Sequence, residues 1–230
     1  MEAESEKYAA GRLTAKPGPI VNLDQVKTGV QSLDLDRDRD GLIYIPAGYE
    51  HTRPAALAVM LHGADAPAEQ GLSLLRKYAD ENNIILIAPV SRSSSWDIIT
   101  ISILGPDVMF IDQALTFAFK TYAIDPAHVA IGGFSDGASY ALSIGLTNGD
   151  LFTHIISFSP GFAHTLKRYG EPAIFISHGV HDTVLPIDPC SRRFAPQLQN
   201  QGLAVKYIEF EGEHTIPSSI SEAAVKWFME

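Results

Sequence analysis

The sequence lacks the features that mark extracellular, membrane or nucleic-acid-binding proteins. It has one cysteine, Cys190, so no disulfide can form within the chain. The sequence therefore gives no sign of an oxidising compartment. Lys and Arg number 17 against 27 Asp and Glu, and the net charge of −10 disfavours nucleic acid or an anionic membrane as a partner. No apolar run has the length of a bilayer span, and the acidic start, residues 1–7, lacks the basic and apolar parts of a secretory signal. We therefore expect a cytoplasmic protein with no membrane insertion.

What the chain does have is enough apolar sequence for a full core. Hydrophobic residues make up 46% of its 230 residues and charged residues 19%, which suits a globular chain with one main domain. Apolar runs of strand length alternate with longer helical patterns, and runs such as residues 84–88 are apolar throughout, as in strands covered on both faces. The alternation predicts an α/β fold with a doubly wound, mainly parallel sheet and helices on both faces.

The pattern also gives the expected boundaries. Strands are expected over residues 41–46, 56–61, 84–89, 129–134, 154–159, 173–177 and 205–210, and helices over residues 68–81, 107–122, 137–147, 189–201 and 217–229. The start of the chain differs, because prolines interrupt it and residues 34–40 are mostly charged. We expect residues 1–40 to form an N-terminal arm and leading edge segment, and residues 41–230 to form the main domain.

A strand, a tight turn and a helix are expected to meet at Ser135. The turn reads Gly133-Phe134-Ser135-Asp136-Gly137, and it lies between an apolar run and a helix-prone run. In a nucleophile elbow the serine occupies a strained turn, and the two glycines leave room where a Cβ would collide with the neighbouring strand and helix. Because this pattern occurs by chance in many sequences, the alternative is an ordinary β-to-α turn with an incidental serine. The residues that follow along the chain favour a catalytic Ser135.

A catalytic serine needs a base, and the base needs a carboxylate to orient it. His214 directly follows the expected strand 205–210, and Asp182 directly follows the expected strand 173–177. Parallel strands bring both to the edge of the sheet where Ser135 lies, in the order serine, aspartate, histidine that one class of serine hydrolases uses. The alternatives are an exposed loop histidine for His214 and a turn or helix-cap aspartate for Asp182.

The tetrahedral intermediate of acyl transfer also needs hydrogen-bond donors. The segment Leu61-His62-Gly63-Ala64 ends an early strand in a glycine turn that can present the Ala64 N–H, and the Asp136 N–H at the start of the following helix would be the second donor. Both are backbone donors of an expected oxyanion hole. His62 is the other candidate base, but a histidine directly after a buried strand is more often a hydrogen-bonded structural residue.

Taken in order, these segments resemble one family. They are Leu61-His62-Gly63, Gly133-Phe134-Ser135-Asp136-Gly137, the segment from His178 to Pro186, and the histidine near the C-terminus. They are similar to the phospholipase/carboxylesterase branch of the α/β-hydrolase superfamily and its polyhydroxybutyrate-depolymerase-like and feruloyl esterase relatives. The resemblance implies that Ser135 is the nucleophile, His214 the base and Asp182 its partner, with the Ala64 and Asp136 amides forming the oxyanion hole.

The resemblance covers residues 41–230, which would then be the catalytic domain. The chain departs from the family pattern at three positions. Asp136 and Ala138 stand where many acyl-protein thioesterases of this branch have Gln and Gly, and Glu213 precedes the histidine where many have Gly. These departures concern the substrate more than the chemistry.

A competing motif suggests a metal site. Residues 36–43 match the first positions of a calcium-binding EF-hand loop. The twelfth position, which normally supplies a bidentate Glu, is Ala47, Pro46 precedes it, and a strand is expected where an EF-hand needs a helix. We therefore expect no metal and no cofactor, and we interpret these aspartates as part of a solvated turn. Cys190 lacks the strand and glycine turn of a nucleophile.

The acyl pocket is expected to be small. The connection over residues 160–172 is too short for a cap domain, so the loop 91–106 is the best remaining cover. Its apolar residues, among them Trp96, are expected either to line a short acyl or aromatic pocket or simply to pack on the domain.

The sequence therefore predicts a serine carboxylesterase that hydrolyses small, short-acyl esters through an acyl-enzyme. The alternatives are a thioesterase or peptidase with the same triad, and a ligand receptor that keeps the fold; the missing cap argues against a receptor, because such receptors signal through the cap. The physiological acyl and alcohol groups and the oligomeric state stay open.

Overall fold

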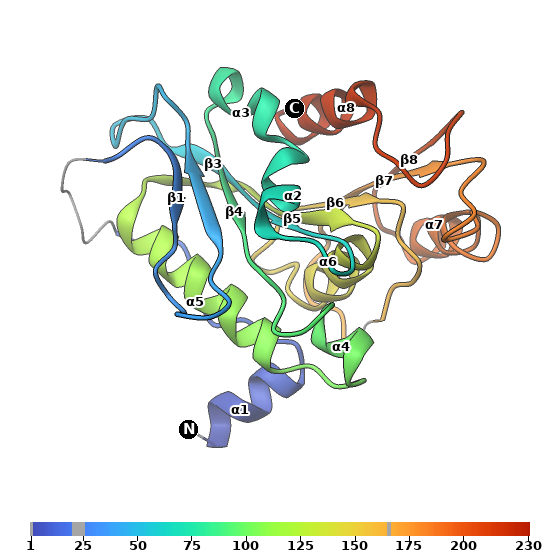
Figure 1. Cartoon of the computed structure of the whole chain (residues 1–230), viewed down its shortest axis with the longest axis horizontal. Helices are drawn as coiled ribbons and strands as arrows, with labels where there is room; N and C mark the ends of the chain where they lie inside the picture. The colour runs from blue at the N-terminus through green and yellow to red at the C-terminus, as the bar shows by residue number, and fades with distance from the viewer. Residues whose placement is uncertain (1, 20–25, 165–166) are drawn as a thin grey trace.

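The computed structural model describes residues 2–19, 26–164 and 167–230, within which eight strands form one sheet (Figure 1). The strands are β1 (Gly29–Ser32), β2 (Leu42–Ile45), β3 (Ala55–Leu61), β4 (Ile84–Ala88), β5 (Ile124–Phe134), β6 (His154–Phe158), β7 (Ala173–Gly179) and β8 (Val205–Phe210). Their spatial order is β1-β2-β4-β3-β5-β6-β7-β8. β2 is antiparallel to both of its neighbours, and every other pair is parallel. The predicted doubly wound, mainly parallel sheet is confirmed.

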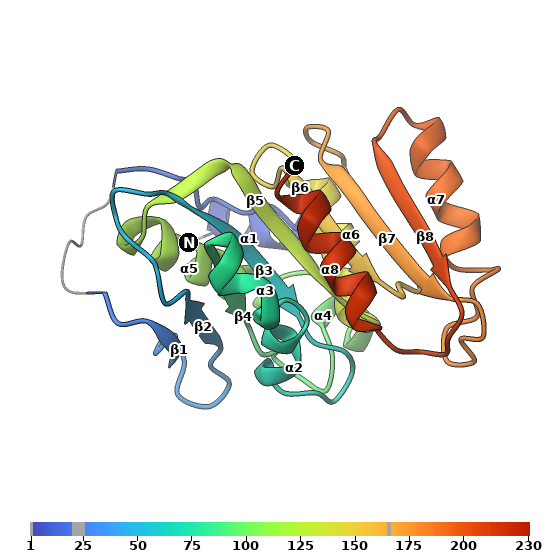
Figure 2. The ribbon, with the colours of Figure 1, turned by 90° about the horizontal axis from the view of Figure 1, so that it is seen from above.

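Helices cover both faces of this sheet. The helices are α1 (Glu2–Ala9), α2 (Ala68–Ser73), α3 (Arg76–Asn82), α4 (Asp97–Thr100), α5 (Pro106–Thr121), α6 (Asp136–Thr147), α7 (Ser191–Asn200) and α8 (Ser218–Phe228). Buried side chains of α2, α3 and α8 form one apolar cluster with one face of the strands, and those of α5, α6 and α7 form another with the opposite face. Figure 2 shows α3 and α8 in front of the sheet. Strands such as β3 and β4 are fully buried because they pack on both sides.

The parallel strands end together at the edge that carries the expected site. Leu61 of β3 pairs with Gly133 of β5, and Gly179 of β7 pairs with Phe210 of β8. The segments that follow these strands hold Ala64, Ser135, Asp182 and His214. The sheet topology thus brings four distant parts of the chain to one edge, which is where open α/β sheets bind ligands.

The helices differ from the expected ones in three places. The helix expected over residues 68–81 is two helices, and Leu74 and Leu75 at the break are 6% and 0% exposed. Adjacent residues of a continuous helix point about 100° apart, so the break allows both leucines to face the core. The loop 91–106 contains the short helix α4, and the N-terminal arm begins with α1; neither helix was expected.

The arm is attached to the main domain along α5 and α6. Leu13 and Ala15 are buried in the core, and the Asp112 carboxylate of α5 accepts the N–H groups of Thr14 and Ala15 at 2.7 and 2.8 Å. Arg12 forms an ion pair with Asp150 at 2.7 Å. The arm therefore contributes apolar side chains and polar anchors to the same core. Residues 20–25 of the arm lie outside the described residues. Among the helices that the structure describes, none has the length and apolar character that crossing a bilayer requires.

Candidate active site

Ser135 lies in the turn between β5 and α6, in a backbone conformation that side chains other than glycine rarely adopt. Its φ and ψ are 56° and −119°, and the turn is held by the Ser135 N–H, which donates to the Phe158 carbonyl at 3.0 Å. Such conformations cost about 1–3 kcal/mol and persist only where the surrounding structure enforces them. Here a Cβ added at Gly137 would overlap the carbonyl oxygens of Leu61 and His62. The close packing of α6 against β3 therefore requires glycine and enforces the turn that the sequence predicted.

Asp182 and His214 form a hydrogen-bonded pair. His214 Nδ1 lies 2.6 Å from Asp182 Oδ2, and the side chains are 15% and 0% exposed. Burial alone would raise the pKa of the Asp182 carboxyl, but hydrogen bonds from His214 and the Leu185 N–H outweigh burial and hold this pKa below its usual range. The carboxylate is thus ionised at neutral pH and oriented toward the histidine.

The His214 ring lies beside the serine turn. Its centroid is 4.6 Å from that of Phe134, the residue before Ser135. Among the hydrogen bonds of the described residues, none involves the Ser135 Oγ, so this hydroxyl is free, as is common for catalytic groups without substrate. Ser135 itself is 8% exposed. The structure therefore joins Asp182 to His214 directly and brings His214 next to the serine turn.

Two backbone amides are available beside Ser135. In the part of the chain that the structure describes, neither the Ala64 N–H nor the Asp136 N–H donates a hydrogen bond. Their neighbours are engaged: Gly63 N–H donates to Gln70 Oε1 at 2.7 Å, and Asp65 N–H donates to the Ser94 carbonyl at 2.7 Å. The free Asp136 amide also opens α6, whose dipole favours negative charge there. These two donors can stabilise an oxyanion.

His62 has the structural environment that the sequence suggested. Its Nδ1 lies 2.6 Å from the Gly63 carbonyl and its Nε2 accepts the Ser91 N–H at 3.0 Å. A carbonyl can only accept, so Nδ1 carries the proton and the ring is neutral. Burial lowers the pKa of His62 and maintains that state. Both nitrogens are used inside the protein, so His62 supports the Gly63–Ala64 turn and has no nitrogen left for a substrate.

Trp96 packs inside the domain, and its predicted role in substrate binding stays a prediction. The side chain is fully buried, its ring is stacked on that of Tyr140 at 5.2 Å, and its Nε1–H donates to the His62 carbonyl at 3.0 Å. Trp96 thus braces the strand end that leads to Ala64. The exposed apolar residues of the same loop are Ile101 and Ile103, at 54% and 61%. Sequence alone could not separate these roles, because Trp96 and the isoleucines are equally apolar.

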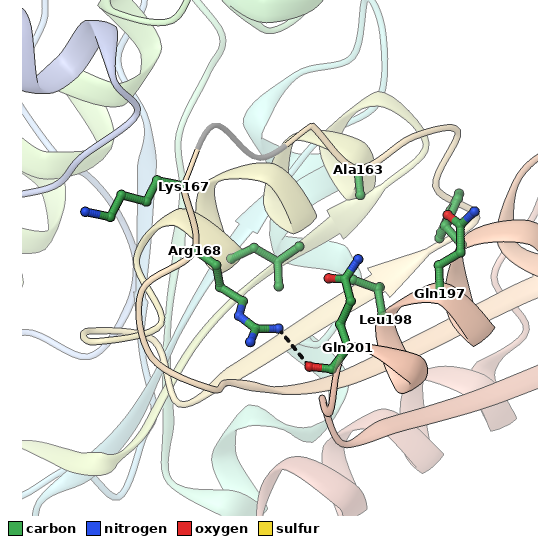
Figure 3. A pocket seen from close by; sticks show the side chains of 8 residues that line it. Ala163, Lys167, Arg168, Gln197, Leu198 and Gln201 are labelled. Atoms are coloured by element: carbon green, nitrogen blue, oxygen red, sulfur yellow. Dashed lines mark hydrogen bonds between the residues drawn. The ribbon is translucent and has the colours of Figure 1, made fainter.

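A small cavity adjoins His214. It has a volume of about 230 Å³ and lies between α2, the end of β5 and the segment before α8, with Gln70, Leu74, Phe134 and Ile216 in its wall. Figure 3 shows a different cavity, of about 320 Å³, between the end of α6 and α7. Its lining includes Arg168 and Leu198 but none of the expected catalytic residues. Of these two cavities, only the smaller is lined by His214.

The aspartates of the EF-hand-like segment have protein partners. The Asp36 carboxylate accepts the N–H groups of Asp38 and Arg39, and the Asp40 carboxylate accepts those of Asp34 and Leu35. These bonds close the turn between β1 and β2. Among the described residues, no group of three or more His, Cys, Asp or Glu side chains could hold a metal ion.

A buried histidine beside the site has no role among the site residues that the sequence predicts. His178, at the end of β7, has its Nε2 3.2 Å from Asp182 Oδ2, and its Nδ1 lies 2.7 Å from Ser191 Oγ. The only sequence signal for His178 is its position, four residues before Asp182 in the same motif. Nothing in the sequence signals Ser191, which comes from the first turn of α7.

Comparison with known proteins supports the resemblance found in the sequence. Residues 109–228 match the phospholipase/carboxylesterase family. The chain is 32% identical over 150 residues to an acetylxylan esterase of Coprinopsis cinerea, a match that covers 60% of this chain and 39% of the relative. It is 24% identical over 182 residues to the "Probable feruloyl esterase C" of Aspergillus terreus, covering 76% of this chain and 65% of that protein. The chain thus spans less than two thirds of the length of either relative.

Solved structures share the fold at low sequence identity. The fluorophosphonate-binding serine hydrolase FphF of Staphylococcus aureus superimposes with a TM-score of 0.67 at 14% identity, covering 88% of this chain and 98% of that chain. The butyrate-bound esterase Est2 of Thermogutta terrifontis has a TM-score of 0.66 at 17% identity, with coverages of 86% and 93%. Because the family match spans more than half of the sequence, the chain belongs to the phospholipase/carboxylesterase family of α/β-hydrolases.

Proposed function

We propose that the chain is a metal-independent serine carboxylesterase that acts on small, short-acyl esters. The observation that carries this proposal is the buried, ionised Asp182 bonded to His214 at 2.6 Å, beside a strained turn that holds Ser135 and two free amides. A base with a fixed tautomer, a serine and a pair of donors are the parts that acyl transfer requires.

In the proposed mechanism His214 Nε2 takes the proton of Ser135 as its Oγ attacks the carbonyl carbon of the ester. The resulting oxyanion accepts the N–H groups of Ala64 and Asp136, and each such donor is typically worth about 3 kcal/mol of barrier. When the intermediate collapses, the C–O bond to the alcohol breaks and His214 returns the proton to the leaving oxygen. Water then attacks the acyl-enzyme with His214 as base, releasing the acid and restoring Ser135.

The preference for short acyl groups follows from the space beside His214. Its cavity of about 230 Å³ is below the range of about 300–1,000 Å³ that is usual for drug-sized ligands. The connection between β6 and β7 is short. In the covering loop 91–106, the exposed residues Ile101 and Ile103 offer only an open apolar surface. Each buried methylene adds about 0.8 kcal/mol of binding only while apolar wall remains to receive it.

Labelling and a substrate series test this proposal. A fluorophosphonate probe followed by peptide mapping should modify Ser135, and Ser135→Ala should fold normally yet lose labelling and most activity. In a p-nitrophenyl ester series, kcat/KM should be highest for acetate or butyrate. Labelling of another residue would contradict the proposed site. A preference for acyl chains of about twelve or more carbons, far more than this cavity could bury, would contradict the short-acyl hypothesis.

The two alternatives of the same fold need separate assays. A thioesterase or peptidase would use the same groups, so matched oxyesters, thioesters and peptides should be compared with one enzyme preparation. The names of the two curated relatives make acetylxylan and feruloyl esters further substrates to include. A receptor would label at Ser135 but turn over poorly and bind a protein partner only in the presence of ligand.

A further inference from the structure

His178 is held in one orientation behind the carboxylate of Asp182. Its side chain is completely buried, and each ring nitrogen has a partner. Nε2 lies 2.8 Å from the Leu185 carbonyl and 3.2 Å from Asp182 Oδ2, and Nδ1 lies 2.7 Å from Ser191 Oγ. His178 therefore contacts the oxygen of Asp182 that also faces His214.

These partners determine the tautomer of His178. The Leu185 carbonyl and the Asp182 carboxylate can only accept hydrogen bonds, so the proton of a neutral ring must be on Nε2. Nδ1 is then an acceptor, and the Ser191 hydroxyl must donate to it. Ser191 is itself fully buried at the first position of α7, so its hydroxyl cannot turn to water instead. Burial lowers the pKa of His178, in keeping with a neutral ring.

The turn after Asp182 depends on the same ring. Asp182 Oδ1 accepts the N–H groups of Val184 and Leu185 at 2.9 and 2.8 Å. The Leu185 carbonyl in turn accepts the His178 Nε2–H. Asp182 Oδ1 is thus fixed by two backbone N–H groups, and Oδ2 lies 2.6 Å from His214 Nδ1 and 3.2 Å from His178 Nε2, whose N–H bonds to the Leu185 carbonyl. Because His178 is neutral, the negative charge of Asp182 is not neutralised by it and remains available to a protonated His214.

We propose that His178, with its tautomer set by Ser191, is a positioning residue that aims Asp182 Oδ2 at His214. This inference rests on the proposed function, since it assigns His178 a role in the same triad. His178 itself does not touch the reacting atoms. Removing its Nε2–H takes away the contact with Oδ2 and the hydrogen bond that closes the 182–185 turn. We therefore expect kcat, which depends on the orientation of His214, to change more than KM. At metal sites, comparable outer partners change activity about 10- to 100-fold.

Two pairs of variants test the role of each atom. His178→Leu removes the donor, whereas the side-chain amide of His178→Gln can place an N–H where Nε2 lies. Ser191→Ala removes the donor to Nδ1, and Ser191→Thr keeps it. We expect His178→Leu to lower kcat for p-nitrophenyl butyrate about 10- to 100-fold with KM unchanged, Ser191→Ala to lower it less, and the Gln and Thr variants to recover most of it. His154→Gln, which replaces a half-buried histidine at the opposite edge of the sheet, is the matched control.

Proton NMR provides a second readout that a merely structural role would not move. The His214 Nδ1–H proton, bonded to a carboxylate, should give a far-downfield signal in the wild type and in His178→Gln but not in His178→Leu. If the wild type is active and a folded His178→Leu variant keeps full activity, the inference about His178 is refuted while the proposed function stands. An inactive wild type would overturn the proposed function, and the NMR signal would still decide the positioning role. If His178→Leu does not fold, an unchanged kcat and signal in Ser191→Ala would refute the role of the tautomer.

Discussion

In Asp182→Asn, the neighbouring backbone amides decide which way the new side chain turns. Asp182 Oδ1 accepts the N–H groups of Val184 and Leu185, two donors that only an oxygen can meet. The Asn NH₂ group must therefore take the place of Oδ2, 2.6 Å from His214 Nδ1. An NH₂ group there donates, so Nδ1 must accept and the imidazole proton moves to Nε2. In the proposed mechanism Nε2 has to take the proton of Ser135, so the variant would hold His214 in the wrong tautomer.

The expected effects on activity and stability are very different in size. In a well-studied serine protease the equivalent change lowers kcat about 10⁴-fold, which corresponds to about 5.5 kcal/mol of transition-state stabilisation. The NH₂ group would also face the Nε2–H of His178, 3.2 Å from the present oxygen. A buried donor without an acceptor costs about 1–3 kcal/mol, and since His178 keeps the Leu185 carbonyl we expect about 1 kcal/mol. In a chain of this size that lowers Tm by about 2–4 °C.

Steady-state kinetics with p-nitrophenyl butyrate and calorimetry of the same samples measure both effects. Asp188→Asn is the control, because it makes the same chemical change on a side chain that is 78% exposed. We expect the control to keep its activity and its Tm. An Asp182→Asn enzyme with kcat within about tenfold of the wild type, against the 10⁴-fold expected, would refute the tautomer argument and point to another acid.

Three further predictions concern acid stability, metals and backbone packing. Burial, with His128 nearby, lowers the pKa of His154 to about 4, whereas a histidine of the unfolded chain binds its proton near pH 6.5. The free energy of unfolding should therefore decline by roughly 1–2 kcal/mol between pH 6.5 and pH 4, after allowing for partial exposure. The pH dependence of Tm should be shallower in His154→Gln. EDTA should change neither activity nor Tm, because the Asp36 and Asp40 carboxylates already accept backbone N–H groups; a calcium-dependent rise in Tm that disappears in Asp38→Ala would contradict this. Gly179→Ala should lower both kcat and Tm, because its Cβ would overlap the Gly212 and Glu213 carbonyls, whereas Gly48→Ala, where a Cβ meets open space, should leave both unchanged.

The parts of the fold that the sequence predicted are those in which a local pattern determines the structure. Uninterrupted apolar runs identified β3 and β4, because strands buried on both faces tolerate no polar residue. The Ser135 turn could be predicted because both of its glycines have a steric cause that the spacing displays. The order of Asp182 and His214 after two strands gave their common edge, and the structure adds the bond that joins them.

The parts that the sequence did not predict depend on contacts between distant segments. The separation of α2 from α3 reflects two leucines that both face the core, which no propensity records. Trp96 and Ile101 lie in one apolar segment, yet one is fully buried and the other is 54% exposed. His178 was visible only as a neighbour of Asp182, because its partner Ser191 comes from another helix. We propose that the described part of the N-terminal arm belongs to the same folding unit as the rest, since Leu13 and Ala15 lie in its core.

The coupling of Asp182 to His214 depends on the main chain as much as on the side chains. Their two loops run side by side: the Val180 N–H donates to the Phe210 carbonyl at 3.0 Å, and the His181 N–H donates to the Gly212 carbonyl at 2.9 Å. Gly179 allows this approach, because any Cβ there would meet the carbonyls of the residues just before His214. A 2.6 Å bond between the side chains thus requires main chains already held at a fixed separation. We therefore expect a substitution that separates the two loops to impair the proposed base even where Asp182 and His214 are both intact.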